Sequence, residues 1–136
     1  MKKGIKSIVH ACFGTSSLQT TRDFYCKVLD GEVVHEFHNA EHELYGMIVK
    51  IGDKSFLEFF LDKTPFVSQQ MFRHLCFEVE DIQSTKKRLE THGFVCEINC
   101  GKTDFTLQLW INDPQGIKLE FHQYDEKSLL TQYLDK

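Results

Sequence analysis

The sequence of 136 residues contains no apolar run long enough to cross a bilayer. It also lacks an excess of basic residues, since 16 lysines and arginines stand against 20 aspartates and glutamates, for a formal net charge of −4. This charge balance argues against a nucleic-acid-binding surface and against a basic patch for anionic membranes. We therefore expect neither nucleic acid nor a membrane among the partners of the chain.

The cysteines do not form a recognisable disulfide framework. There are five, an odd number, and none belongs to a Cys-x-x-Cys motif. The first residues are basic, but the apolar stretch that follows is short and lacks the small-residue cleavage site of a signal peptide. We therefore expect reduced thiols and a cytoplasmic location.

What the chain does contain is an internal repeat. HACF at residues 10–13 returns as HLCF at residues 74–77, and LEFF at residues 57–60 returns as LEFH at residues 119–122. Two long copies of one unit favour a pair of related modules over a solenoid array of short repeats.

The repeat predicts the domain organisation. One module is expected over residues 6–61 and the other over residues 70–124, joined by a polar segment that contains proline. A tail follows over residues 125–136. We expect these parts to make a single domain that spans residues 1–136.

Each module shows the same order of expected elements. A short apolar strand, at residues 7–13 or 72–79, is followed by a helix with a Ser or Asp N-cap, at residues 16–29 or 81–93. Three further strands are expected in each module, at residues 32–38, 44–51 and 55–61, and at residues 94–100, 105–113 and 117–124. The order β-α-β-β-β, repeated twice, predicts an α+β fold in which each helix covers one face of a mixed four-stranded sheet.

The uncovered face of each sheet carries a histidine and a glutamate, because strand residues alternate between the two faces. His10 on the first strand and Glu58 on the last share this face in one module, 48 residues apart. His74 and Glu120 do so in the other module, 46 residues apart. If the first and last strands are neighbours and the modules pack face to face, these side chains form a set suited to a divalent transition metal.

Single residues of these types would not support a metal site. A lone histidine on a strand is more often an ordinary core or surface residue, and a lone glutamate usually faces solvent. The argument rests on matching positions in two modules. The same alternation places Cys76 and His122 on the uncovered face of the second module, and Cys12 on that of the first. We interpret Cys12 and Cys76 as small buried thiols rather than as metal ligands.

The sequence resembles the vicinal oxygen chelate superfamily, the group of glyoxalase I, bleomycin-resistance proteins and extradiol dioxygenases. The resemblance covers nearly the whole chain and is carried by VHACFGTSSLQTTRDFYCKVLDGEVV, FLEFF, RHLCFEVEDIQSTKKRLETHGF and NDPQGIKLEFHQY. It implies paired βαβββ modules around a metal-containing cleft. By position, the resemblance implies that the metal ligands are His10, Glu58, His74 and Glu120. With a glutamate at position 58, the chain resembles the glyoxalase I-like branch best.

The resemblance also implies a reaction. A lyase or isomerase of this branch acts on a small substrate with vicinal oxygens through a metal-bound enediolate, with Ni, Co, Zn or Fe as the divalent ion. By the same resemblance Glu120, with Glu58 as a second candidate, moves the proton. The Asn-Trp-Gly stretch of glyoxalase I and its glutathione-binding residues have no counterparts here, which argues against a glutathione substrate. A homodimer is expected, because clefts in this superfamily can form between subunits.

Four residues are candidates for the wall of the substrate site. Thr106, Gln108 and Trp110 alternate onto the predicted cleft face, and Ile48 takes the position of Trp110 in the first module. Packing of Trp110 in the core or in an interface is an equally good interpretation.

Two other functions stay open at this point. An Fe(II)-dependent dioxygenase of the same superfamily needs three ligands, which would leave one carboxylate without a role. A non-catalytic drug-binding protein is the other alternative. Retention of all four ligand positions argues against it, since such relatives often lack them.

Overall fold

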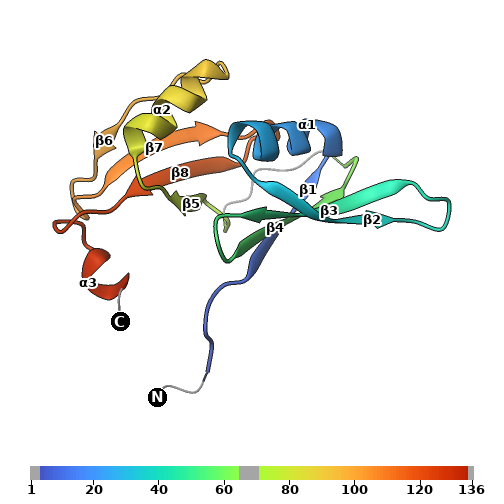
Figure 1. Cartoon of the computed structure of the whole chain (residues 1–136), viewed down its shortest axis with the longest axis horizontal. Coiled ribbons are helices and arrows are strands. Elements are labelled where there is room, and N and C mark those ends of the chain that lie inside the picture. The colour runs from blue at the N-terminus through green and yellow to red at the C-terminus, as the bar shows by residue number, and fades with distance from the viewer. Residues whose placement is uncertain (1–3, 65–70, 135–136) are drawn as a thin grey trace. The chain divides into compact units, whose positions relative to one another are not determined.

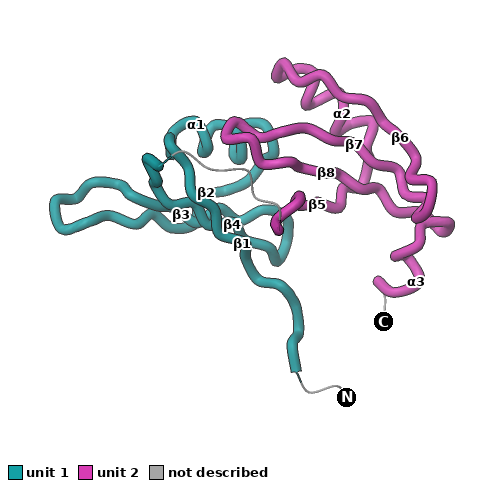
Figure 2. Tube along the Cα trace, turned by 180° about the vertical axis from the view of Figure 1, so that it is seen from behind, with its two compact units in different colours: residues 1–67 teal, residues 68–136 magenta. Residues whose placement is uncertain are grey.

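A computed structural model describes residues 4–64 and 71–134 and divides the chain into two compact units, residues 1–67 and 68–136 (Figure 2). Each unit contains one four-stranded mixed sheet (Figure 1), which confirms the predicted α+β class with a βαβββ order in each half. The module limits 6–61 and 70–124 stay predictions. Residue 70, most of the joining segment and the last two residues of the tail lie outside the described residues.

The first unit places its first and last strands side by side. Its elements are β1 (His10–Thr15), α1 (Leu18–Arg22), the π-helical η1 (Asp23–Val28), β2 (Glu32–His38), β3 (Leu44–Ile51) and β4 (Ser55–Leu61). The sheet order is β1-β4-β3-β2, with β1 parallel to β4 and the other neighbours antiparallel. At the start of α1, the Ser17 hydroxyl accepts a hydrogen bond from the Thr20 N–H at 3.2 Å.

The second unit repeats this topology. Its elements are β5 (Leu75–Glu78), α2 (Ile82–Thr91), β6 (Asn99–Cys100), β7 (Leu107–Asn112), β8 (Lys118–Gln123) and the short α3 (Thr131–Leu134). The sheet order is β5-β8-β7-β6, and β5 is parallel to β8. The Asp81 carboxylate caps α2 by accepting hydrogen bonds from the N–H groups of Gln83 and Ser84.

The strand predictions for 32–38, 44–51 and 55–61 agree with β2, β3 and β4. The first strand begins at His10 rather than at residue 7, because its pairing with β4 starts opposite Phe56. The strand expected over 94–100 is limited to Asn99 and Cys100, which are the residues that pair with β7. Apolar alternation does not report where cross-strand pairing begins, so these limits could not be read from the pattern.

The helix expected over residues 16–29 has two parts. After α1 the chain widens into the π-helical η1, and the Leu29 N–H bonds to the carbonyl oxygen of Phe24, five residues earlier. An apolar pattern at near-helical spacing is compatible with either winding, so the sequence did not distinguish them.

The core of each unit lies between the sheet and its helix. In the first unit Phe59 is buried against Phe13 and Tyr25, with ring centroids 5.9 and 4.7 Å away. In the second unit Phe121 takes the matching position and lies 5.6 Å from the Phe77 ring. Each unit therefore covers one sheet face with its own helix, and its His–Glu pair lies on the opposite face. Within the described residues, no helix combines the length and the apolar character that crossing a membrane requires.

Candidate functional site

His10 and Glu58 lie together on the uncovered face of the first unit. They come from the parallel neighbours β1 and β4, and the His10 Nε2 is 3.4 Å from the Glu58 Oε2. The register places Glu58 between Cys12 on β1 and Ile48 on β3. The Glu58 side chain keeps 20% of its surface exposed, so this pair is open to solvent.

His74 and Glu120 form the matching pair in the second unit. The His74 Nε2 is 3.0 Å from the Glu120 Oε2, and Glu120 stands between Cys76 on β5 and Trp110 on β7. The Glu120 side chain is only 7% exposed. A carboxylate that is buried to this extent needs hydrogen-bonding or ionic partners, and His74 supplies one of them.

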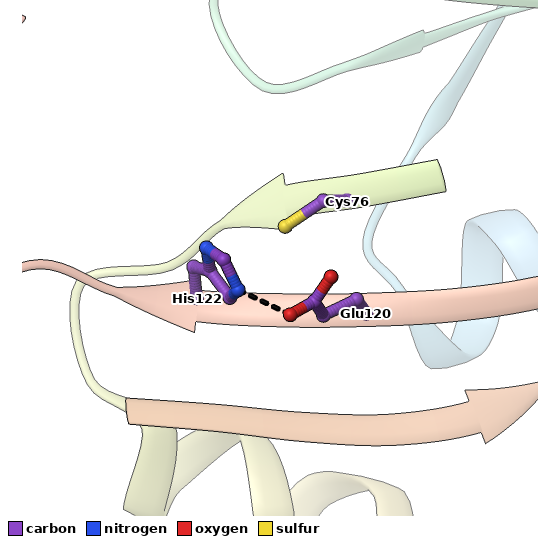
Figure 3. A group of neighbouring side chains, drawn as sticks. All are labelled: Cys76, Glu120 and His122. Carbon is purple, nitrogen blue, oxygen red and sulfur yellow. Dashed lines mark hydrogen bonds and ion pairs between the residues drawn. The ribbon is translucent and has the colours of Figure 1, made fainter. Parts of the chain in front are cut away.

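His122 supplies a second partner, which the sequence analysis placed on this face without assigning it a role. The His122 Nε2 contacts the Glu120 Oε1 directly (Figure 3), and the other ring nitrogen, Nδ1, is 3.0 Å from the Tyr124 hydroxyl. The Glu120 carboxylate therefore has an imidazole at each oxygen, His74 at Oε2 and His122 at Oε1.

The interpretation of Cys12 and Cys76 as buried thiols is wrong, because both residues are exposed. They lie on the face that the helix of their unit does not cover. The Cys76 sulfur nevertheless points toward Glu120 and His122 (Figure 3), and the resulting desolvation, together with the nearby Glu120 charge, raises the pKa of the thiol to about 12. The pKa of Cys12 is also raised, by partial desolvation of its sulfur and by the charge of Glu58, although the residue as a whole is exposed.

Among the residues the structure describes, one group of three metal-binding side chains has its ligand atoms within 4.8 Å of one another: Cys76, Glu120 and His122. Residues 120 and 122 share a face because they are two apart on β8, and the register brings Cys76 beside Glu120. The sequence signal for this group was the alternation of strand residues between the two faces of the sheet, which places all three residues on one face.

Two of the substrate-wall candidates lie beside this group. Gln108 pairs with His122 and Trp110 pairs with Glu120 across β7 and β8. The Trp110 indole N–H donates to the Gln108 side-chain oxygen at 2.7 Å, and the Lys118 ammonium lies 4.5 Å from the centre of the Trp110 ring. Trp110 thus presents a fixed aromatic surface near the carboxylate.

The other two candidates are placed differently. Thr106 precedes β7, is fully buried and donates its hydroxyl proton to the Asp104 carbonyl at 3.2 Å. Ile48 lies opposite Glu58 in the first unit. A substrate-binding role for all four candidates stays a prediction.

The donor chemistry of the two His–Glu pairs fits a divalent transition metal. Each pair brings an imidazole nitrogen and a carboxylate oxygen to one place on an uncovered sheet face. Imidazole and carboxylate ligands suit zinc, nickel, cobalt and iron.

The sequence profile of the Glyoxalase/Bleomycin resistance protein/Dioxygenase superfamily matches residues 7–121. With the two βαβββ units, this match establishes that the chain belongs to that superfamily. The sequence resemblance to this group is thereby confirmed.

Two relatives are similar in sequence. The uncharacterized protein YaeR of Escherichia coli (strain K12) is 24% identical over 128 residues, which cover 88% of this chain and 98% of YaeR. The mitochondrial methylmalonyl-CoA epimerase of Dictyostelium discoideum is 31% identical over 99 residues, which cover 65% of this chain and 58% of the epimerase.

Solved structures share the fold over most of the chain. A glyoxalase family protein from Enterococcus faecalis superposes with a TM-score of 0.72 and 28% identity, over 86% of this chain and 97% of its own. A lactoylglutathione lyase from Agrobacterium tumefaciens and the antibiotic binding protein TnmS3 from Streptomyces sp. CB03234 each give a TM-score of 0.70 at 18% identity. These superpositions cover 92% and 91% of this chain and 97% and 100% of the two structures. At such identity they show the fold alone.

Proposed function

We propose that this chain is a metal-dependent lyase or isomerase of the glyoxalase I-like kind, acting on a small substrate with vicinal oxygens. The observation that carries the proposal is the repeated His–Glu pair. The nitrogen-to-oxygen distance is 3.4 Å for His10 and Glu58 and 3.0 Å for His74 and Glu120. In each pair the glutamate lies on the last strand of its unit, and the histidine lies on or directly before the first strand, since His10 begins β1 and His74 precedes β5. A structural scaffold alone has no need for the same two residue types at both places.

We infer that the two pairs supply four ligands to one divalent ion, from one chain or from two chains of a homodimer. The ligands would be His10, Glu58, His74 and Glu120, and nickel, cobalt, zinc and iron all accept this donor set. Such an ion, when bound, supplies Lewis acidity toward the vicinal oxygens of a substrate.

Glu120 is the residue that we assign to proton transfer. Its carboxylate is nearly buried and faces an imidazole at each oxygen, so its orientation is fixed. A fixed carboxylate can remove a proton from a carbon next to a carbonyl group and return it to the same or the neighbouring carbon. Glu58, which is more exposed, is the second candidate for this role. Gln108 and Trp110, with Thr106 and Ile48, would contribute to the substrate wall.

The sequence relative supports this class of chemistry. Epimerisation at a carbon next to a carbonyl also requires a proton to be removed and returned, and an epimerase is 31% identical to part of this chain. The substrate class that we propose is therefore a small carbonyl compound with a second oxygen on or next to the reacting carbon. We also propose that the protein is a cytoplasmic homodimer, and light scattering of the purified protein tests the dimer.

Hydrogen exchange in heavy water tests the proton transfer on a panel of candidate substrates. The metal-loaded protein is incubated with the hemithioacetal of methylglyoxal and glutathione, with methylmalonyl-CoA and with small hydroxyketones, and deuterium on carbon is measured by NMR. The Glu120→Gln variant should lose roughly 10²–10⁴-fold in exchange rate while circular dichroism stays unchanged. Glu78→Gln, on the neighbouring strand β5, is the matched control and should keep the rate.

Elemental analysis of protein purified without added metal separates the alternatives. Nickel, cobalt or zinc supports the lyase or isomerase, whereas iron together with oxygen consumption on a catechol supports a dioxygenase. Metal-free protein that binds a drug-like molecule supports a binding protein. An active Glu120→Gln variant contradicts the role that we assign to this carboxylate.

A further inference from the structure

The second unit carries two metal-binding side chains beyond its His–Glu pair. Cys76 lies opposite Glu120 in the register of β5 and β8, and His122 follows Glu120 by two residues on β8. The sulfur, carboxylate and imidazole atoms of these three residues lie within 4.8 Å of one another, and Figure 3 shows the sulfur directed toward the other two.

We propose that the second unit holds a thiolate-containing zinc site of its own, formed by Cys76, Glu120 and His122. Cysteine sulfur, histidine nitrogen and carboxylate oxygen are all common zinc ligands. Ligand atoms around a tetrahedral zinc ion are roughly 3.3–3.8 Å apart, so the most distant of the three atoms need to approach by about 1 Å at most. The His122 Nε2 and the Glu120 Oε1, which are in direct contact, need to move apart to admit the ion. Three protein ligands leave the fourth position to water or to a small ligand.

The surroundings of His122 fit this role. The ring is nearly buried, and its Nδ1 is 3.0 Å from the Tyr124 hydroxyl. Without an ion, a hydrogen occupies the contact between the His122 Nε2 and the Glu120 Oε1. When zinc replaces that hydrogen, an Nδ1–H that donates to the Tyr124 oxygen leaves the Nε2 lone pair free for the ion. A partner at the far nitrogen is the usual way in which proteins fix the tautomer and the orientation of a metal-bound histidine. When the ion binds, the Cys76 thiol releases its proton to solvent.

The first unit provides an internal contrast, because it has a cysteine and a glutamate at the same places but no histidine at the place of His122. Cys12 lies opposite Glu58, as Cys76 does opposite Glu120. The position of His122 is occupied by Phe60, whose ring packs 5.2 Å from that of Phe37. The three-ligand arrangement is therefore a property of the second unit and not of the repeated fold.

This site does not depend on the four-ligand ion of the proposed function. It uses neither His10 nor Glu58, and it draws on Glu120, which both ligand sets contain. Zinc held by Cys76 and His122 would therefore compete for that carboxylate. The chemistry differs as well, because only the second set includes sulfur, and a thiolate ligand has a distinct spectroscopic signature.

Cobalt substitution of the reduced, full-length protein tests the proposal. Cobalt(II) bound to a thiolate gives a charge-transfer absorption in the near ultraviolet, whereas cobalt bound only to imidazole and carboxylate does not. The informative variants are Cys76→Ser and His122→Phe, and the latter introduces the residue found in the first unit. Cys12→Ser and the double variant His10→Ala/Glu58→Ala are the matched controls, and circular dichroism verifies the fold of each protein.

The wild-type protein and both controls should show the charge-transfer absorption. Cys76→Ser should abolish it, and His122→Phe should weaken zinc affinity by about tenfold or more, measured by competition with a chromogenic chelator. Cobalt binding without the absorption, or an absorption that survives Cys76→Ser, overturns the zinc site. If either of these results is found and the His10→Ala/Glu58→Ala variant no longer binds metal, the zinc site is wrong but the proposed function still stands. An absorption that persists in this double variant while wild-type protein shows no proton exchange keeps the zinc site and contradicts the proposed function.

Discussion

The two units have the same topology but differ in what surrounds the glutamate of the last strand. Glu58 contacts one imidazole and keeps 20% of its side chain exposed, whereas Glu120 lies between two imidazoles and is 7% exposed. The second imidazole comes from one position, which is Phe60 in the first unit and His122 in the second. The two units therefore share the register that brings a His–Glu pair together. They differ in the residue that follows the glutamate by two places on the last strand, and this residue sets whether the carboxylate has a second imidazole partner.

The same position changes the character of the whole face. In the first unit, Phe60 lies within 5.2 Å of the Phe37 ring and within 6.1 Å of the Tyr45 ring, measured between centroids. Gly46, between them on β3, has no side chain to separate these rings. In the second unit the matching place on β7 is occupied by the polar Gln108. At this place, therefore, the uncovered face of the first unit carries aromatic rings and that of the second unit carries polar side chains.

The largest effect is expected where the units are alike. Phe59→Ala and Phe121→Ala each remove a ring from the helix-facing core and should lower the free energy of unfolding by about 3–5 kcal/mol. Urea denaturation of the two variants measures this. Because the two rings take equivalent positions and are equally buried, a cost confined to one variant would show that the units do not share one packing scheme.

The next largest effect is expected at a pair of buried hydroxyl groups, which distinguishes the first unit from the second. Thr15 and Thr21 are fully buried with their hydroxyl oxygens 2.7 Å apart, whereas the second unit has Val79 at the place of Thr15. Thr15→Val leaves the Thr21 hydroxyl without this partner and should cost about 1–3 kcal/mol of unfolding free energy. Thr85→Val is the control, since Thr85 bonds at a more exposed place to the Asp81 carbonyl. Equal costs in thermal unfolding would refute the distinction.

A comparable or slightly smaller effect concerns the aromatic face. A β-carbon at Gly46 would overlap the Phe60 ring, so Gly46→Ala should displace that ring and destabilise the protein by about 1–3 kcal/mol. Gln108→Ala at the matching place in the second unit should cost less, because Gln108 is only partly buried and its truncation forces no neighbouring ring to move. The change in near-ultraviolet circular dichroism should likewise be larger for Gly46→Ala. No difference between the two variants would contradict the close packing that we describe.

The smallest effect concerns the helix caps, Ser17 in the first unit and Asp81 in the second. Hydrogen bonds from the Ser84 hydroxyl, from the Ser84 N–H and from the Gln83 N–H hold the pKa of Asp81 below its ordinary value of 3.8. A lowered pKa in the folded state means that the cap stabilises the protein fully above the unfolded pKa. This stabilisation is lost as the pH falls through the folded pKa.

Asp81→Asn keeps the capping geometry but removes the titration. The variant should therefore have a flatter dependence of the melting temperature on pH below about pH 4. Ser17→Asn in the first unit should leave that dependence as it is in the wild-type protein. An unchanged slope in Asp81→Asn would contradict the assignment.

Most of the fold could be predicted because the hydrophobic pattern and the repeat agree. The strands of the first unit, residues 32–38, 44–51 and 55–61, follow directly from apolar runs bounded by turn residues. The π-helical turn after Arg22 could not be predicted, because the spacing of its buried side chains is compatible with an α-helix as well as with a π-helix.

The candidate site could be predicted in part. Alternation assigned His74, Cys76, Glu120 and His122 to one face, since that depends only on strand parity. It could not show that His122 reaches the carboxylate, because this depends on the side-chain rotamer and on the Tyr124 hydroxyl. The burial of Cys76 was wrongly predicted because a small apolar side chain was equated with the core, whereas the residue lies on the face without a helix.

The parallel pairing of the first strand with the last has a consequence for how the protein is made. His10 and Glu58, like His74 and Glu120, are far apart in sequence and meet only after the strands between them are in place. The formation of these pairs closes loops of 48 and 46 residues, which carries a cost in chain entropy. A growing chain that emerges from the ribosome can complete its first pair before Glu120 has been synthesised. Each His–Glu pair is therefore present only in a finished unit.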